Sequence, residues 1–427
     1  MTTPPQFIPD ETQRLKRAVE ELSILNDLAR AIGSTLNLEE IMQTIVRRSL
    51  RAVHAEQGVI TLVDSKSAEP TKTLVRAMVS SSDHVEFHLH QALLGWMHLN
   101  MKPLLVENPQ RDDRFSGVRW DEAIDSLLCV PLLVKSELKG VLTVYNKKDR
   151  QKFNVDDQRL LTIIAGQSSQ VIENARLYEE ERQFIKMQEE VHLASRIQLD
   201  LLPKEMPKLD SYDIVGKTIP AQTVGGDYFD FIRTTDNRLA LCLGDVTGKG
   251  LPASLLMANL QATLRGQTLV AGHPRECLSR SNILLYQSTS PEKFATLFFG
   301  ILDSRNHQLS YSNAGHDHPF LISTDGSFRR LDRGGMMLGA FEEATFEDES
   351  VQIKTGDVII VYSDGITEAM NVRGEQYGEE RLSQLLVSQR NRSPQEMLQS
   401  LVQDVQLHAG NCPQSDDVTI LIARRTK

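Results

Sequence analysis

The chain has 427 residues, 40% hydrophobic and 24% charged, which suits about two to four folded domains and excludes wholesale disorder. Its 47 basic and 57 acidic side chains give a net charge of −10, which disfavours binding to nucleic acid or to anionic lipid. The four scattered cysteines form no CxxC pair and no apolar run reaches the roughly 18 residues of a membrane span, so we expect a cytoplasmic protein without disulfides or a thiolate zinc site.

Residues 1–10 hold three prolines and predict a loose tail. An apolar seam with 3-4 spacing then predicts a helix, its members being Leu15, Ala18, Leu22, Leu25, Ala29 and Ile32. A second helix is expected over residues 38–53. From Gly58 to Asn146, short β-rich runs alternate with turn residues, and a helix over about residues 156–178 closes the segment. This order predicts an α+β domain of about 150 residues with an antiparallel sheet.

A strongly charged helix is predicted over residues 174–203, where Pro203 and Pro207 end it. One heptad stripe on this helix is mostly apolar and consists of Leu177, Glu180, Phe184, Met187, Val191, Ala194, Gln198 and Leu201. The stripe indicates either a helix that lies on a flanking domain or a short parallel coiled coil that pairs two subunits. Both interpretations remain open at this point.

The C-terminal half again mixes strands and helices. Strands are predicted over residues 212–219, 227–233, 238–245, 295–303, 308–315, 318–323, 349–354, 357–364 and 418–423. Helices are predicted over residues 252–267, 274–288, 378–389 and 394–408. Many strands grouped around paired helices indicate a β-sandwich that is flanked by helices.

Carboxylates stand at the ends of several buried strands in this half. The run LALCLG leads into Asp245, DVIIVY leads into Asp364, and Asp416 and Asp417 precede VTILI, while Asp227 follows two glycines at the start of a strand. Converging carboxylates would repel one another unless a divalent cation lay among them. Oxygen ligands without a nearby histidine or cysteine pair favour Mg²⁺ or Mn²⁺, and two such ions would activate a water for phosphoryl chemistry.

Six motifs occur in an order that resembles the bacterial PPM-type serine/threonine phosphatases of the stage-II-sporulation-E kind, over about residues 185–425. They are VGGDYFD (224–230), GDVTGKGLPA (244–253), ATLFFG (295–300), NAGH (313–316), YSDGITEA (362–369) and DDVT (416–419). The resemblance implies an αββα sandwich with a binuclear Mn²⁺ or Mg²⁺ site. It also implies that the substrate is a phosphoserine or phosphothreonine on a small anti-sigma-factor antagonist, in partner-switching signalling.

Carried over by motif, Asp245 would bridge both metals and the Val246 carbonyl would bind one of them. Asp364 and Asp416 would complete the shell of the first ion, with Asp417 as the alternative to Asp416, and Asp227 would hold the second metal or its waters. We therefore expect Asp227, Asp245, Asp364 and Asp416 to be the catalytic set.

Two departures from that family pattern bear on substrate choice. Lys249 stands where many members carry histidine, and residues 334–339 (GGMMLG) replace a more usual proline pair. Lys249 is expected to be either a solvated lysine or a contact to the substrate phosphate. His316 in the NAGH motif is expected to shape a turn.

Residues 22–176 resemble the GAF sensory domain. The stretches that carry the resemblance are LNDLA (25–29), LLCVPL (127–132), GVLTV (140–144) and FNVDD (153–157). The resemblance implies a small-molecule ligand of unknown identity and a Lys147–Asp157 pair with a structural role. Cys129 lies inside an apolar strand pattern, and we expect it to be part of the core.

These interpretations divide the chain into a tail with the start of a helix (1–21), a GAF domain (22–176), a coiled-coil-like linker helix (177–205) and a phosphatase domain (206–427). We expect a homodimer that contacts neither nucleic acid nor membrane. Two alternatives are a sensor histidine kinase that uses His192 as phosphoacceptor, and a catalytically silent dimeric sensor or scaffold. The first lacks a proline-bearing box after His192, and the second would normally have lost metal aspartates.

Overall fold

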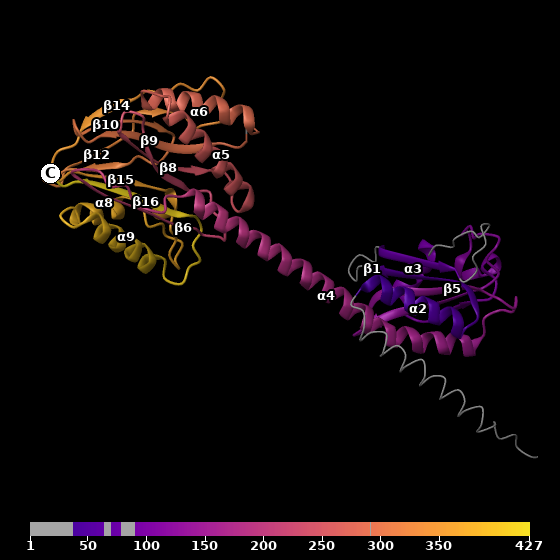
Figure 1. Ribbon diagram of the computed structural model, residues 1–427. Coiled ribbons are helices and arrows are strands. Elements are labelled where there is room, and N and C mark those ends of the chain that lie inside the picture. The colour runs from indigo at the N-terminus through magenta and orange to yellow at the C-terminus, as the bar shows by residue number, and fades with distance from the viewer. Residues whose placement is uncertain (1–36, 64–69, 78–89, 291) are drawn as a thin grey trace, which may run out of the picture. The chain divides into compact units, whose positions relative to one another are not determined.

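The computed structural model describes residues 37–63, 70–77, 90–290 and 292–427, so the predicted seam at residues 15–32 lies outside the described residues. The chain divides into two compact units, with the boundary between Lys186 and Met187, inside the linker predicted at residues 177–205. The first unit has one sheet and the second has two (Figure 1), and each unit has its own apolar cores. Within the described ranges, every helix is too short or too polar to cross a lipid bilayer.

The first unit is built on one antiparallel sheet with the strand order β2-β1-β5-β4-β3. Its elements are α2 (Leu38–Ala52), β1 (Ala55–Val63), β2 (Pro70–Ala77), α3 (Gln91–Asn100), β3 (Leu104–Val106), the short 3₁₀ turns η1 (Pro109–Arg111) and η2 (Asp113–Phe115), β4 (Leu127–Val134) and β5 (Glu137–Lys147). The structure thus agrees with the predicted helix at residues 38–53 and with the predicted β-rich runs between residues 58 and 146, whereas α3 was not predicted.

Both faces of this sheet are covered, because its central strands are apolar on both sides. One face packs against α2 and the first part of α4 through residues such as Ile45, Leu142 and Ile164. The other face packs against α3 and the 3₁₀ turns, with Met97 and Trp120 in that core. The unit is therefore an α+β layer structure, as the sequence predicts.

A single helix, α4 (Val155–Leu201), replaces the two overlapping helices that the sequence predicts over residues 156–178 and 174–203. Residues 174–178 contain neither glycine nor proline, so nothing in the sequence interrupts the backbone hydrogen bonds between the two stretches. Between Leu177 and Ile197 most side chains are exposed, and Phe184 and Met187 of the heptad stripe are 60% and 66% exposed. The helix ends two residues before Pro203, as predicted.

The second unit contains two sheets and five further helices among the residues that the structure describes. The elements are β6 (Tyr212–Ile219), β7 (Tyr228–Arg233), β8 (Leu239–Val246), α5 (Leu251–Thr268), α6 (Pro274–Ser288), β9 (Ala295–Asp303), β10 (Gln308–Ala314), β11 (Phe320–Ile322), β12 (Phe328–Arg330), β13 (Gly334–Gly335), β14 (Glu349–Gln352), β15 (Val358–Tyr362), α7 (Asp364–Thr367), α8 (Glu379–Ser388), α9 (Pro394–Ala409) and β16 (Val418–Arg425). One sheet has the order β13-β10-β9-β8-β7 with β14 beside β10, and the other has the order β12-β11-β15-β16-β6.

The two sheets face each other across a shared core, and a helix pair covers the outer face of each (Figure 1). Strand β8 shows how the sequence produces these layers. Leu241 and Leu243 lie in the core between the sheets, whereas Ala240 and Cys242 face α5 and α6. Because successive side chains of a strand point to opposite faces, one apolar run serves both cores. Helices α8 and α9 cover the other sheet in the same way.

Candidate metal centre

Strand β8 delivers Asp245 and Val246 to one end of the sandwich, where the chain turns into α5. Gly248 and Gly250 both have positive φ (98° and 69°), which only glycine adopts without strain, and α5 starts at Leu251 directly afterwards. Neighbouring backbone approaches this strand end closely. A Cβ added at Gly226 would lie 3.0 Å from Oδ1 of Asp245 and 3.2 Å from the Val246 carbonyl oxygen. A side chain at residue 226 would therefore press on Asp245, and glycine lets the predicted 224–230 motif approach it closely.

Asp417 joins that motif to the start of β16. Its Oδ2 accepts hydrogen bonds from the backbone N–H groups of Gly226 (2.7 Å) and Asp227 (3.3 Å), and its Oδ1 accepts one from Ala221 N–H (2.8 Å). The residue is buried. Both carboxylate oxygens are thus occupied by main-chain donors, which gives Asp417 a structural contact with each end of the segment 221–227.

The turn that carries Asp364 packs on the same residue. The Ser363 hydroxyl donates to the Asp417 carbonyl (3.0 Å) and accepts from Thr419 N–H (2.9 Å). A Cβ at Gly365 would lie 2.0 Å from the Asp417 carbonyl oxygen, so the close approach of α7 to β16 requires glycine there. The SDG sequence therefore places Asp364 beside residues 416–417.

Asp416 has a different environment from Asp417. Its Oδ2 forms an ion pair with Lys249 Nζ at 2.9 Å, and its Oδ1 accepts a hydrogen bond from Asp417 N–H. The Asp416 side chain is about one-third exposed, at 32%. Of the two adjacent aspartates, Asp416 is the one whose carboxylate is open to a cation from solvent.

The predicted carboxylates are close enough to perturb one another. Burial first, and then the negative charges of the neighbouring aspartates, beginning with Asp364, raise the pKa of Asp245 to about 7. Burial and then the charge of Asp245 raise the pKa of Asp227 well above its ordinary value. Burial and then the charge of Asp416 raise the pKa of Asp364. The structure therefore brings together all the acidic side chains that the sequence singled out.

The donor set fits a hard divalent cation. Only oxygen donors converge, and the buried Oδ2 of Asp227 accepts no hydrogen bond. A nearby cation would stabilise the charged forms of these repelling carboxylates. As the described side chains stand, no three His, Cys, Asp or Glu residues form a ready ligand group.

The end of α4 also reaches this region through Gln198, a residue that the sequence placed in the heptad stripe without a role. Its side-chain amide donates from Nε2 to the Gly225 carbonyl (2.6 Å), and its Oε1 accepts from Gly225 N–H (3.1 Å). The side chain is buried, unlike most of the stripe. The signal that could have identified it is an uncharged polar residue between the apolar Ala194 and Leu201, at the end of the stripe.

The NAGH motif forms a tight turn, as predicted. Asn313 accepts from His316 N–H (2.7 Å) and donates to the His316 carbonyl (2.9 Å). The imidazole Nδ1 of His316 lies 3.0 Å from the Thr296 hydroxyl, and burial lowers the pKa of His316 to about 4. The ring is therefore neutral at pH 7.

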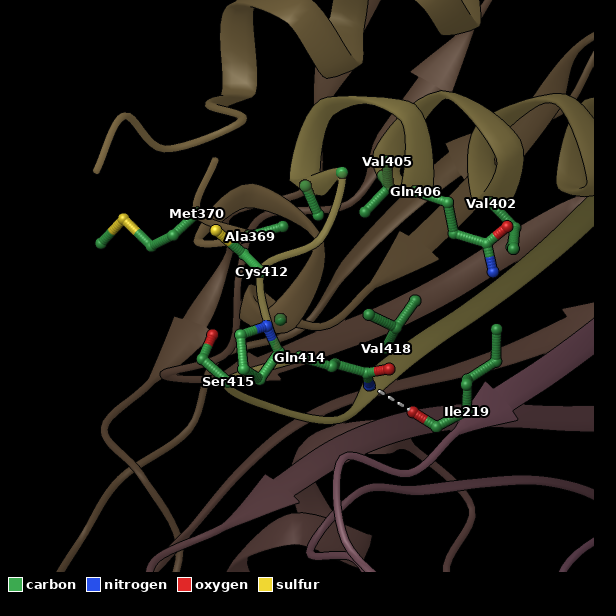
Figure 2. A pocket seen from close by; sticks show the side chains of 14 residues that line it. Ile219, Ala369, Met370, Val402, Val405, Gln406, Cys412, Gln414, Ser415 and Val418 are labelled. Carbon is green, nitrogen blue, oxygen red and sulfur yellow. Dashed lines mark hydrogen bonds between the residues drawn. The ribbon is translucent and has the colours of Figure 1, made fainter. Parts of the chain in front are cut away.

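A cavity of about 220 Å³ lies beside the turns that carry Asp364 and Asp416 (Figure 2). The Gln414 side chain crosses its floor and donates from Nε2 to the carbonyl oxygens of Ile219 (2.7 Å) and Asp416 (2.8 Å). The remaining lining residues are mostly apolar, and they are Gly365, Ala369, Met370, Val402, Val405, Gln406, Ala409, Gly410, Cys412, Pro413, Ser415 and Val418. The cavity therefore adjoins the backbone of the candidate metal centre.

The predictions for the first unit concern three side chains. Lys147 Nζ contacts both carboxylate oxygens of Asp157 at 3.2 and 3.0 Å, so the predicted structural pair is present. Cys129 is fully buried against the Thr143 hydroxyl, and burial raises the pKa of its thiol to about 12. Its predicted place in the core is confirmed.

Two family models match parts of the chain. Residues 235–426 match the family model of stage II sporulation protein E (SpoIIE), and residues 35–173 match that of the GAF domain. The SiaA-PP2C domain of Pseudomonas aeruginosa has a similar fold, with a TM-score of 0.51 at 21% identity over 57% of this chain and 98% of that one.

Two curated relatives are similar in sequence. Phosphoserine phosphatase RsbU of Bacillus subtilis is 28% identical over 247 residues, which cover 56% of this chain and 71% of RsbU. Protein IcfG of a Synechocystis species is 29% identical over 263 residues, which cover 55% of this chain and 41% of IcfG. The chain therefore spans less than half the length of IcfG. These matches favour the phosphatase interpretation over the histidine kinase.

Proposed function

Because the chain carries a GAF domain followed by a SpoIIE-type PP2C phosphatase domain, we propose that it is a metal-dependent protein serine/threonine phosphatase regulated by its N-terminal domain. The observation that carries this proposal is the meeting of carboxylates from four distant segments at one end of the β-sandwich. A silent scaffold would have no need for several buried acids that repel one another.

Four side chains and one carbonyl would hold two Mn²⁺ or Mg²⁺ ions. We assign Asp245 to both ions, and the Val246 carbonyl, Asp364 and Asp416 to the first of them. Asp227, whose Oδ2 is buried without a hydrogen-bond partner, would hold the second ion or its waters. When bound, the ions would supply an activated water and neutralise charge on the phosphoryl oxygens.

Asp417 has a positioning role in this proposal. Its two oxygens bind main-chain N–H groups of residues 221–227, so they are not free for a cation. The carboxylate thereby fixes the segment that carries Asp227, and its carbonyl fixes Ser363 next to Asp364. We therefore choose Asp416 over Asp417 as the metal ligand.

We infer that the substrate is a phosphoprotein. The relative RsbU is named a phosphoserine phosphatase, and the resemblance implies a phosphoserine or phosphothreonine on an anti-sigma-factor antagonist. Within this proposal the protein itself provides no nucleophile, because the attacking group is water. The carboxylates would hold the ions that supply this water, and the partly exposed side of the site near Asp416 would admit the phosphorylated segment.

Hydrolysis of p-nitrophenyl phosphate by the full-length protein tests this function. We expect activity with Mn²⁺ or Mg²⁺ that EDTA abolishes, and a loss of at least about 100-fold in the Asp245→Ala variant, because a metal ligand is removed. The matched control is Asp213→Ala, which replaces an exposed aspartate of β6 away from this end of the sheet. Full activity in Asp245→Ala, or activity that resists EDTA, would contradict the proposal.

Regulation is proposed to run through α4. The GAF domain would bind a small molecule whose identity the residues do not specify, and residues 177–205 would pair two copies of the chain as a coiled coil. Pairing is supported by exposed apolar residues of the stripe. In a single chain, about half or more of the surface of Leu177, Phe184 and Met187 is exposed to solvent. Gln198 connects the same helix to Gly225, two residues before Asp227.

Deletion of residues 1–170 tests this coupling. We expect the truncated protein to differ from the full chain in its rate of p-nitrophenyl phosphate hydrolysis and in its mass by light scattering. If both the rate and the oligomeric state are unchanged, the first unit has no regulatory role in this reaction.

A further inference from the structure

Lys249 forms the contact in the candidate metal centre that the proposed function leaves unexplained. Its ammonium lies 2.9 Å from Asp416 Oδ2 and donates a hydrogen bond to the Ser415 carbonyl at 2.7 Å. Two oxygens from adjacent residues therefore hold one cationic group. Asp416 is the residue to which a divalent ion would have to bind.

The turn after β8 aims Lys249 at this position. Gly248 and Gly250 on either side of it have positive φ, and Asp245 lies four residues earlier in the chain. Lys249 thus connects two segments that carry carboxylates. It follows the end of β8, which carries Asp245, and its ammonium contacts residues 415 and 416. A charged side chain that lies about half in solvent, at 53% exposure, normally has no need of such a bridge.

We propose that Lys249 is an internal competitor for the metal. In the metal-free protein its ammonium replaces the cation at Asp416, and it must leave before Asp416 can coordinate an ion. This inference rests on the proposed function, because it assumes that Asp416 is a ligand. A single positive charge compensates one carboxylate, whereas a divalent ion compensates two, so the ion displaces the ammonium once its concentration is sufficient.

The expected effect of removing the competitor is modest. Exposed ion pairs stabilise proteins by an amount that corresponds to a factor of roughly 1.5 to 5 in an equilibrium constant. We therefore expect the Lys249→Met variant, which keeps the length of the side chain, to bind Mn²⁺ about two- to five-fold more tightly than the wild type. Lys249→Arg retains the positive charge and should stay within about two-fold of the wild type.

The measurement is isothermal titration of the full-length protein with MnCl₂, and Lys293→Met is the matched control. Lys293 Nζ lies near the same turn, 3.5 Å from where a Cβ of Gly248 would be, and it forms no ion pair with any acid in the described part of the chain. The same charge is thus removed close by without breaking the bridge. Binding should tighten more in Lys249→Met than in this control.

A second readout follows the lysine itself. Acetic anhydride labels exposed amines, and peptide mass spectrometry reports the labelled fraction at residue 249. We expect Mn²⁺ to increase labelling of Lys249 while leaving Lys293 unchanged, because the ion releases the ammonium from Asp416.

The outcomes separate the two proposals. If the wild type binds no Mn²⁺ at all, the proposed function is wrong. If it binds Mn²⁺ but Lys249→Met binds no more tightly than Lys293→Met, or Mn²⁺ leaves Lys249 labelling unchanged, only the role of Lys249 is overturned.

Discussion

Replacement by asparagine is expected to affect the adjacent residues Asp416 and Asp417 differently: it should lower stability mainly at Asp417 and weaken metal binding at Asp416. An Asp417→Asn variant keeps one acceptor oxygen and turns the other into an NH₂ group that faces a backbone N–H. One of the two short bonds, to Gly226 or Ala221, is therefore lost. A buried hydrogen bond to a charged group is worth about 1.5–3 kcal/mol, so we expect the free energy of unfolding to fall by about 2–3 kcal/mol.

For a unit of this size, each 1 kcal/mol shifts Tm by about 2–4 °C, so Asp417→Asn should lower Tm by roughly 4–12 °C. Asp416→Asn loses only the half-exposed pair with Lys249, worth at most about 1 kcal/mol, and should change Tm by about 4 °C or less in EDTA. Excess Mn²⁺ should raise the Tm of the wild type and of Asp417→Asn, and should raise that of Asp416→Asn less, because this variant lacks one ligand of the first ion.

Differential scanning calorimetry of the full-length protein is the appropriate assay. The two tryptophans, Trp96 and Trp120, both belong to the first unit, so tryptophan fluorescence would not follow the second. The reasoning is refuted if Asp416→Asn lowers Tm in EDTA as much as Asp417→Asn does. It is also refuted if Mn²⁺ stabilises Asp416→Asn fully.

Two further predictions concern residues next to the metal centre. Gln198→Ala leaves the N–H and C=O of Gly225 without their side-chain partners, so calorimetry should show the second unit destabilised by about 2 kcal/mol; an unchanged Tm would contradict this. Burial lowers the pKa of His316 from 6.5 to about 4. Between these pH values the unfolded chain binds more protons than the folded chain, so the free energy of unfolding should fall as the pH drops from 6.5 to 4. The expected fall is at most about 3 kcal/mol. A His316→Gln variant should lose this slope in calorimetry at stepped pH, and a retained slope would assign it to other groups.

The layers of the second unit were predictable because its strands are apolar on both faces, and this pattern is visible in the sequence. The alternation of Leu241 and Leu243 with Ala240 and Cys242 is visible in the sequence, and the structure places the two sets in different cores. Helix α3 was missed, since Gly95 interrupts its pattern and only Leu93, Leu94 and Met97 are buried along it. Such a helix depends on tertiary packing rather than on a strong local signal.

The sequence predicted which aspartates belong to the site, but not the hydrogen bonds and ion pairs that these aspartates form. Motif order identified Asp227, Asp245, Asp364, Asp416 and Asp417 but not Asp317, whose pKa is raised by burial and by Asp364. Neighbours in sequence such as Asp416 and Asp417 cannot be distinguished without their partners. The pairing of Lys249 with Asp416 joins residues 167 positions apart, and that of Gln198 with Gly225 depends on where α4 ends. These contacts are fixed by the packed fold, beyond the reach of local spacing.

Asp417 links the segments 221–227, 363–365 and 416–419 through hydrogen bonds between protein atoms. These bonds hold the three segments in place without an ion. Little conformational entropy is then lost when the cation arrives, in contrast to small zinc domains that fold only around their metal. We therefore expect the domain to fold while divalent ions are scarce and to bind them afterwards. Removal of the ions with a chelator should then be reversible, without unfolding of the domain.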